Sequence, residues 1–109
     1  MNERLKFRMY FFVPYNISPI QQAIQAGHAA LEYAHKYGNN KDYISFIEND
    51  KTWIILNGGT TNSIWDENGI PLGSLDQIRE NLRDNKINNS HFVEPDLNNA
   101  LTAVCFLAD

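Results

Sequence analysis

Hydrophobic and polar positions follow the period of a helix between Ser18 and Gly38, the most regular stretch of the chain. Ser18, Pro19 and Gln21 give a helix start: an N-cap, a proline at the first helical position and a Ser-x-x-Gln capping box. Gly38 stands where a chain commonly leaves a helix in the left-handed conformation. Small and apolar residues at helical spacing predict the face that packs on the core: Ile20, Ala23, Ile24, Gly27, Leu31 and Ala34.

Two continuous apolar runs predict buried strands on either side of this helix, at residues 5–13 (LKFRMYFFV) and 51–56 (KTWIIL). The apolar run within the first segment does not alternate with polar residues, so we expect both of its faces to be covered and its position to be central. Pro14 lacks a backbone N–H and ends this first strand. Shorter apolar segments predict two more strands, at residues 91–93 and 101–107.

Further helices are predicted at residues 42–48 and 74–84. A strand–helix–strand beginning predicts parallel pairing with a right-handed crossover, whereas the last two strands either pair antiparallel or diverge. We therefore expect an α/β fold: a single three-layer α/β/α domain over residues 1–109, with a four-stranded, mostly parallel mixed sheet. The stretch at about 57–73 is an inserted loop, long enough to be either functional or mobile.

Composition and charge narrow the classes of partner. A chain of 109 residues with 43% hydrophobic content suits one core, and a net charge of -4 argues against broad DNA or RNA binding. The single cysteine, Cys105, lies in an apolar run and is expected to be a buried, inert, reduced thiol. No apolar run is long enough for a membrane span or a signal peptide, so a cytoplasmic protein without a membrane partner is expected.

Two loops are candidates for ligand contacts. Tyr15 and Asn16 join the first strand to the N-terminus of the long helix, where outward backbone N–H groups favour anions and where many α/β proteins bind ligands. The loop from Asn57 to Asn62 (NGGTTN) could hold a phosphate, but no Gly-Lys-Ser/Thr follows it as in a P-loop, so a plain flexible loop is favoured.

The segment IQAGHAALEY resembles the signature helix of the archaeal and eukaryotic-type peptidyl-tRNA hydrolases. The downstream order is similar too: a buried strand, a helix, a short strand ending in an acid, and a closing apolar strand. The resemblance implies the fold of that family, an ester-cleaving relative acting on the tRNA 3′ end, and a homodimer. The matching positions are Gln25, His28, Ala29, Ala30 and Leu31.

The same resemblance identifies positions that have changed. The family is thought to use a Lys at the helix entrance, an Asp after the third strand and a Thr shortly beyond. Aligned on His28, these fall on Gln21, Glu94 and Asn98. An amide forms hydrogen bonds but supplies no positive charge, and the acid is longer by one methylene. The resemblance therefore implies a remodelled cleft that binds a nucleotide-like ligand or an RNA 3′ end without cleaving it.

Three functions follow from these patterns. The first is non-catalytic binding, and a weaker resemblance of the chain to small bacteriophage proteins suggests that a host nucleotide signal is sequestered in the host cytoplasm. The second is an active esterase that releases peptide or amino acid from tRNA, with Glu94 as the catalytic residue. The third is a protein-interaction module with no small-molecule site. The acidic balance and the missing lysine favour the first function over the second.

No cofactor is expected. His28, Glu32 and His35 share a helix face at a spacing that metal sites use, but one helix supplies too few ligands, so no metal is predicted. The predicted ligand-binding residues gather at loop and helix ends near one cleft. They are Tyr15, Asn16, Gln21, Gln25, His28, Asn57, Thr60, Glu94, Asp96 and Asn98.

Overall fold

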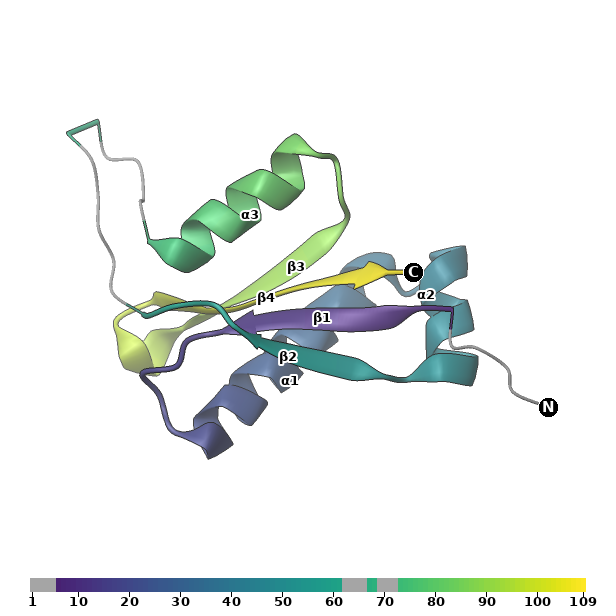
Figure 1. The fold of residues 1–109 in the computed structure, drawn as a ribbon, viewed down its shortest axis with the longest axis horizontal. Helices are drawn as coiled ribbons and strands as arrows, with labels where there is room; N and C mark the ends of the chain where they lie inside the picture. The colour runs from purple at the N-terminus through teal and green to yellow at the C-terminus, as the bar shows by residue number, and fades with distance from the viewer. Residues whose placement is uncertain (1–5, 62–66, 69–72) are drawn as a thin grey trace.

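The computed structural model describes residues 6–61, 67–68 and 73–109, which form a mixed sheet with helices packed against it (Figure 1). Much of the predicted loop insertion at about 57–73 lies outside the described residues. The elements follow in the order β1 (Arg8–Val13), α1 (Pro19–Tyr37), α2 (Lys41–Ser45), the π-helical turn η1 (Phe46–Asp50), β2 (Trp53–Asn57), α3 (Ser74–Asp84), β3 (Asn89–Glu94), the 3-10 turn η2 (Pro95–Leu97) and β4 (Ala100–Ala108).

The sheet has the strand order β2-β1-β4-β3, so β1 is central as predicted. The pair β1–β2 is parallel, which confirms the predicted parallel pairing of the first two strands, whereas β1–β4 and β3–β4 are antiparallel. The four-stranded mixed sheet of an α/β fold is thus confirmed, but the prediction that it is mostly parallel is wrong. The reason is that β4 enters the sheet beside β1 after the short turn η2, which reverses the chain.

Two clusters of buried side chains use alternate residues of β4. Ala103 and Cys105 pack with Ala26 and Ala29 of α1, while Val104 packs with Leu75 of α3. Successive side chains of a strand point to opposite faces, so α1 and α3 contact different faces of β4. The alanines of α1 have little bulk, and this allows the helix backbone to lie close to the sheet.

Helix α1 begins at the predicted N-cap, where Ser18 Oγ accepts a hydrogen bond from the Gln21 backbone N–H at 3.2 Å. Its end differs from the prediction. Gly38 has φ -58°, a right-handed conformation, instead of the left-handed one expected. A Cβ at Gly38 would lie 2.6 Å from the Ala34 carbonyl oxygen, so glycine is needed here for space and not for handedness.

The predicted core face of α1 is wrong. Ile20 is 74% exposed and Leu31 is 70% exposed, whereas the residues that face the sheet are Gln25, Ala26, Ala29 and Tyr33. Each residue turns a helix by about 100°, and at that spacing the buried residues lie on roughly the opposite side of α1 from the predicted face. The buried stripe includes Gln25, a polar residue that no hydrophobic pattern would place inside.

Strand β2 was predicted to be buried, and this is wrong as well. It forms an edge of the sheet, and Trp53 and Ile55 remain 44% and 46% exposed. These two residues pair with Met9 and Phe11 of β1, which are buried against α1, so they lie on that same face of the sheet.

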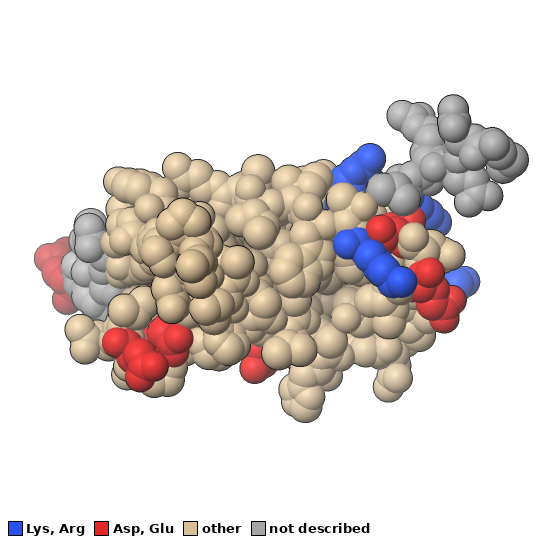
Figure 2. Space-filling view, turned by 90° about the horizontal axis from the view of Figure 1, so that it is seen from below, with Lys and Arg blue, Asp and Glu red and all other residues tan. Residues whose placement is uncertain are grey.

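Exposed apolar residues of α1 and β2 thus lie on the same side of the sheet, and we call this set the apolar face: Ile20, Ile24, Leu31, Trp53 and Ile55. Figure 2 views the molecule from the side on which α1 lies in Figure 1, and few Lys, Arg, Asp or Glu side chains appear across its middle. In the described part of the chain, no helix combines the length and the apolar character needed to cross a membrane.

Candidate ligand-binding site

One end of the sheet gathers most of the predicted site residues. The carboxyl ends of β1 and β2 meet there because these strands are parallel. The carboxyl end of β3 reaches the same end, since β3 is antiparallel to β4 and β4 is antiparallel to β1. Helix α1 also begins there, as the left-hand end of Figure 1 shows. This is the arrangement in which α/β proteins commonly bind ligands.

Gln25 is the centre of a buried hydrogen-bond network at this end. Its side chain is 0% exposed, and its Nε2 donates to Glu94 Oε1 at 3.0 Å and lies 3.4 Å from Gln21 Oε1. Its Oε1 accepts from the Thr102 hydroxyl at 2.6 Å. Every polar atom of the Gln25 side chain is thus engaged, and the amide fixes the Glu94 carboxylate at the end of β3.

A cavity of about 390 Å³ lies beside this network. That volume falls in the range of small-molecule sites, roughly 300–1,000 Å³. Its polar groups can accept hydrogen bonds through carboxylates and can both donate and accept through an amide and a hydroxyl. The described lining residues include two acids and no Lys or Arg: Ile17, Ser18, Gln21, Glu94, Asp96 and Leu97.

Four other predicted residues lie at the same end but hold loops together. Asn16 donates from Nδ2 to Thr61 Oγ1 at 2.9 Å and accepts from the Thr61 backbone N–H at 3.1 Å. Asn57 Oδ1 accepts from the Gly59 N–H at 2.8 Å, and the Tyr15 N–H donates to the Gly59 carbonyl at 2.8 Å. These contacts fasten the loop after β2 to the loop after β1.

The Thr60 backbone N–H lies 3.4 Å from Ser74 Oγ, and the same hydroxyl donates to the Gly58 carbonyl at 2.7 Å. A Cβ at Gly58 would lie 2.5 Å from Leu75 Cδ2, so this glycine allows α3 to approach closely. The loop at residues 57–61 therefore packs against the start of α3. It is not an open loop shaped to bind a phosphate. Asn62, the end of the predicted loop, lies outside the described residues.

His28 and Asn98 do not line the cavity. The His28 ring stacks on Phe92 of β3, with centroids 4.3 Å apart and an interplanar angle of 20°. Asn98 follows η2 and adopts φ +55°, a left-handed turn conformation that asparagine tolerates. The structure thus brings Gln21, Gln25, Glu94 and Asp96 together and leaves these two residues apart from them.

Thr102 was missed by the sequence analysis. It is 0% exposed and lies within the apolar strand β4, where its hydroxyl contacts Gln25. A single hydroxyl inside an otherwise apolar run was the available signal, because a buried hydroxyl requires a partner. Its partner is Gln25 on the facing helix α1, a second polar residue in a buried position.

Cys105 is buried as predicted, with its Sγ 3.0 Å from Ser90 Oγ. Burial raises the pKa of the Cys105 thiol to about 12, although the hydrogen bond with Ser90 opposes this shift. The thiol is therefore neutral at pH 7 and is no nucleophile. Within the described ranges, no three His, Cys, Asp or Glu side chains are grouped as metal ligands would be.

Comparison with known proteins gives no further assignment: no family model matches the chain, and no curated protein matches it.

Proposed function

We propose that this protein binds a nucleotide-like ligand or an RNA 3′ end in the cavity between Gln21 and Glu94, without cleaving it. The observation that carries the proposal is the position of Glu94, which the buried Gln25 holds at the rim of that cavity. Glu94 and Asp96 can accept hydrogen bonds from ribose hydroxyls or base amino groups, while Ile17 and Leu97 offer apolar surface to a base.

The missing cation supports binding over hydrolysis. In the peptidyl-tRNA hydrolases that the chain resembles, a lysine is thought to occupy the position where Gln21 stands. Cleavage of an ester builds negative charge on an oxygen, and preorganised cations or N–H donors stabilise that charge. The described lining of this cavity carries acids instead, which would oppose the developing charge.

The proposal includes the fold family. We take the chain to be a divergent peptidyl-tRNA hydrolase-like protein with a three-layer α/β/α arrangement, since α1 and α3 contact alternate residues of β4. A bacteriophage protein of this kind would sequester a nucleotide signal in the host cytoplasm.

Calorimetry against nucleosides, nucleotides and a short RNA with a free 3′ end tests the binding function. Glu94→Gln is expected to weaken binding by about tenfold, because a hydrogen bond to a charged group is worth roughly 1.5–3 kcal/mol. The amide oxygen that this substitution introduces would still accept from Gln25, so the fold should persist. Glu48→Gln, an exposed acid in η1, is the matched control and should bind like the wild type.

Mass spectrometry of the ligand after denaturation separates binding from catalysis. Intact ligand supports the proposal. Cleavage of peptidyl- or aminoacyl-RNA that is lost in Glu94→Gln would contradict binding without cleavage. It would show that the protein is an ester hydrolase. Binding of no member of the panel would contradict both.

The apolar face favours a second function, association with another protein copy. Its five large side chains on α1 and β2 are between 42% and 74% exposed, and large exposed apolar surfaces commonly mark protein interfaces. We propose a homodimer through this face, which is compatible with ligand binding at the sheet end.

Sedimentation analysis tests the dimer. Leu31→Glu is expected to shift the protein from dimer to monomer with little change in monomer stability, because Leu31 is 70% exposed in the single chain. Ile87→Glu, a 39% exposed position outside the apolar face, is the control and should remain dimeric. A wild-type protein that stays monomeric at high concentration would contradict the dimer.

A further inference from the structure

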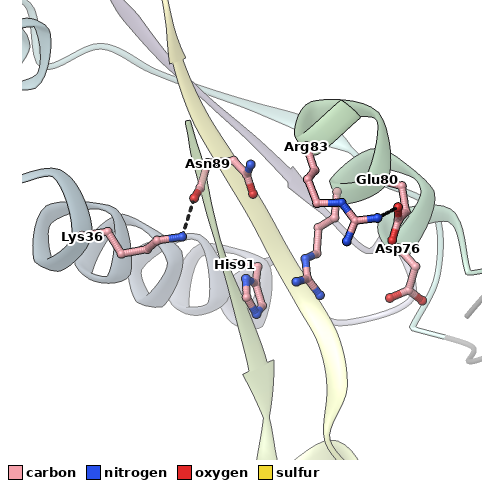
Figure 3. A pocket seen from close by; sticks show the side chains of 7 residues that line it. Lys36, Asp76, Glu80, Arg83, Asn89 and His91 are labelled. Atoms are coloured by element: carbon pink, nitrogen blue, oxygen red, sulfur yellow. Dashed lines mark hydrogen bonds and ion pairs between the residues drawn. The ribbon is translucent and has the colours of Figure 1, made fainter. Parts of the chain in front are cut away.

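A second cavity, of about 250 Å³, lies near the amino end of β3, at the far end of that strand from Glu94. Figure 3 shows it between α3, the last turns of α1 and the edge strand β3. Its lining is almost entirely polar or charged: Lys36, Asp76, Arg79, Glu80, Arg83, Asn89 and His91.

Three cations from two helices converge on this cavity. Lys36 comes from the end of α1, and Arg79 and Arg83 stand at i and i+4 on one face of α3. The whole chain has nine Lys and Arg residues and a net charge of -4, so a third of its strong cations gather here. Like charges repel, and such a gathering favours an anion that neutralises it.

Two of these cations keep free hydrogen-bonding capacity. Lys36 Nζ donates to the Asn89 carbonyl at 3.1 Å, which uses one of its three donors. Arg79 forms no hydrogen bond or ion pair with another described residue, whereas Arg83 pairs with Glu80 (Figure 3). With Glu80 engaged by Arg83, Asp76 is the remaining acid in the lining, opposite two available cations.

His91 supplies a neutral donor beside them. Burial lowers the pKa of His91, and the nearby charges of Arg79 and Lys36 lower it further, while Glu32 on α1 raises it. The imidazole is thus neutral at pH 7 and carries one N–H that can donate to an anion. The charged groups that surround it from both helices are Glu32, Lys36, Asp76, Arg79, Glu80 and Arg83.

We propose that this pocket binds a phosphate group through Arg79, Lys36 and His91. A planar guanidinium forms paired hydrogen bonds with phosphate oxygens, and an ammonium adds a compact charge. The volume is smaller than the roughly 300–1,000 Å³ of a pocket for a whole drug-sized ligand, which suits a phosphate or diphosphate moiety. The site is separate from the cavity beside Glu94 and does not depend on the function proposed for that cavity.

Inorganic pyrophosphate is the first probe, measured by calorimetry at about 50 mM salt and again at about 200 mM, where binding should weaken because exposed charges are screened. Arg79→Gln is expected to lower the affinity by about tenfold or more, since it removes a charge-assisted contact. Lys41→Gln, an exposed cation on α2, is the control and should bind like the wild type. Glu94→Gln should also leave this binding unchanged, which separates the two sites.

Histidine NMR gives a second readout. Bound pyrophosphate should raise the pKa of His91, because its negative charge offsets that of Arg79 and Lys36. A 5′-mononucleotide and a 5′-phosphorylated RNA oligomer then distinguish a free phosphate ligand from a chain end, and binding of either through Arg79 supports the site. Absence of binding for all three probes, or binding that Arg79→Gln leaves unchanged, would overturn the proposal.

Discussion

Replacing Gln25 with leucine is expected to lower the free energy of unfolding by about 2–3 kcal/mol. The substitution keeps a side chain of similar size at a fully buried position, so it opens little space. It removes the amide that donates to Glu94 and accepts from Thr102. The half-buried Glu94 carboxylate then loses this donor, and the buried Thr102 hydroxyl keeps only the Phe92 carbonyl at 3.3 Å as its partner. Removing hydrogen-bond partners inside a protein costs more than a single hydrogen bond gains.

Urea unfolding measures this loss, and a thermal scan should show a fall in Tm of roughly 4–8 °C per kcal/mol for a domain of this size. Gln21→Leu is the matched control on the same helix, because Gln21 is exposed and its loss should change stability by less than about 0.5 kcal/mol. Equal losses for the two variants would show that the network around Gln25 does not stabilise the fold. Gln25→Leu should also weaken ligand binding, since Glu94 is no longer held in position.

The largest loss is expected from Phe11→Ala, about 3–5 kcal/mol. Phe11 is 0% exposed at the centre of β1, packs within the α1 cluster and has its ring centroid 4.5 Å from that of Trp53. Truncation removes a large buried ring and leaves a cavity between the sheet and α1, which a close-packed interior fills only in part.

Ile55→Ala provides the control for Phe11→Ala, because Ile55 is the register partner of Phe11 on β2. Ile55 is 46% exposed, so its truncation should cost only about 1 kcal/mol. Denaturant midpoints at low protein concentration compare the two variants in the single chain. A cost for Ile55→Ala as large as that for Phe11→Ala would contradict the edge position of β2.

The parts of the fold that were predictable from sequence depend on local chemistry. Ser18 and Pro19 fix the start of α1 because capping involves residues only a few positions apart. The central position of β1 was predicted from its continuous apolar run, which is also a property of residues close together in the sequence. The run in β2 looked alike, yet β2 is an edge strand, since strand order depends on pairing between segments far apart in the chain.

The buried face of α1 could not be predicted because it depends on residues far along the chain. Gln25 is tolerated inside only because Thr102 and Glu94, at sequence separations of 77 and 69, supply its partners. A scale of hydrophobicity ranks Ile24 above Gln25 and places the wrong stripe against the sheet. The clustering of Gln21 with Glu94 at the cavity was expected only through the resemblance to peptidyl-tRNA hydrolases, which gave a spatial frame that the residues alone do not contain.

The pairing of β1 with β4 has a consequence for synthesis of the protein. Tyr10 lies opposite Phe106, so the two middle strands come from segments far apart in the chain, and β1 is synthesised before β4. Until β4 has emerged, β1 lacks one of its two neighbours and α1 lacks much of the surface on which it packs. Such long-range closure slows folding and leaves apolar surface open meanwhile. The nascent chain is therefore expected to need chaperone protection until translation has passed β4.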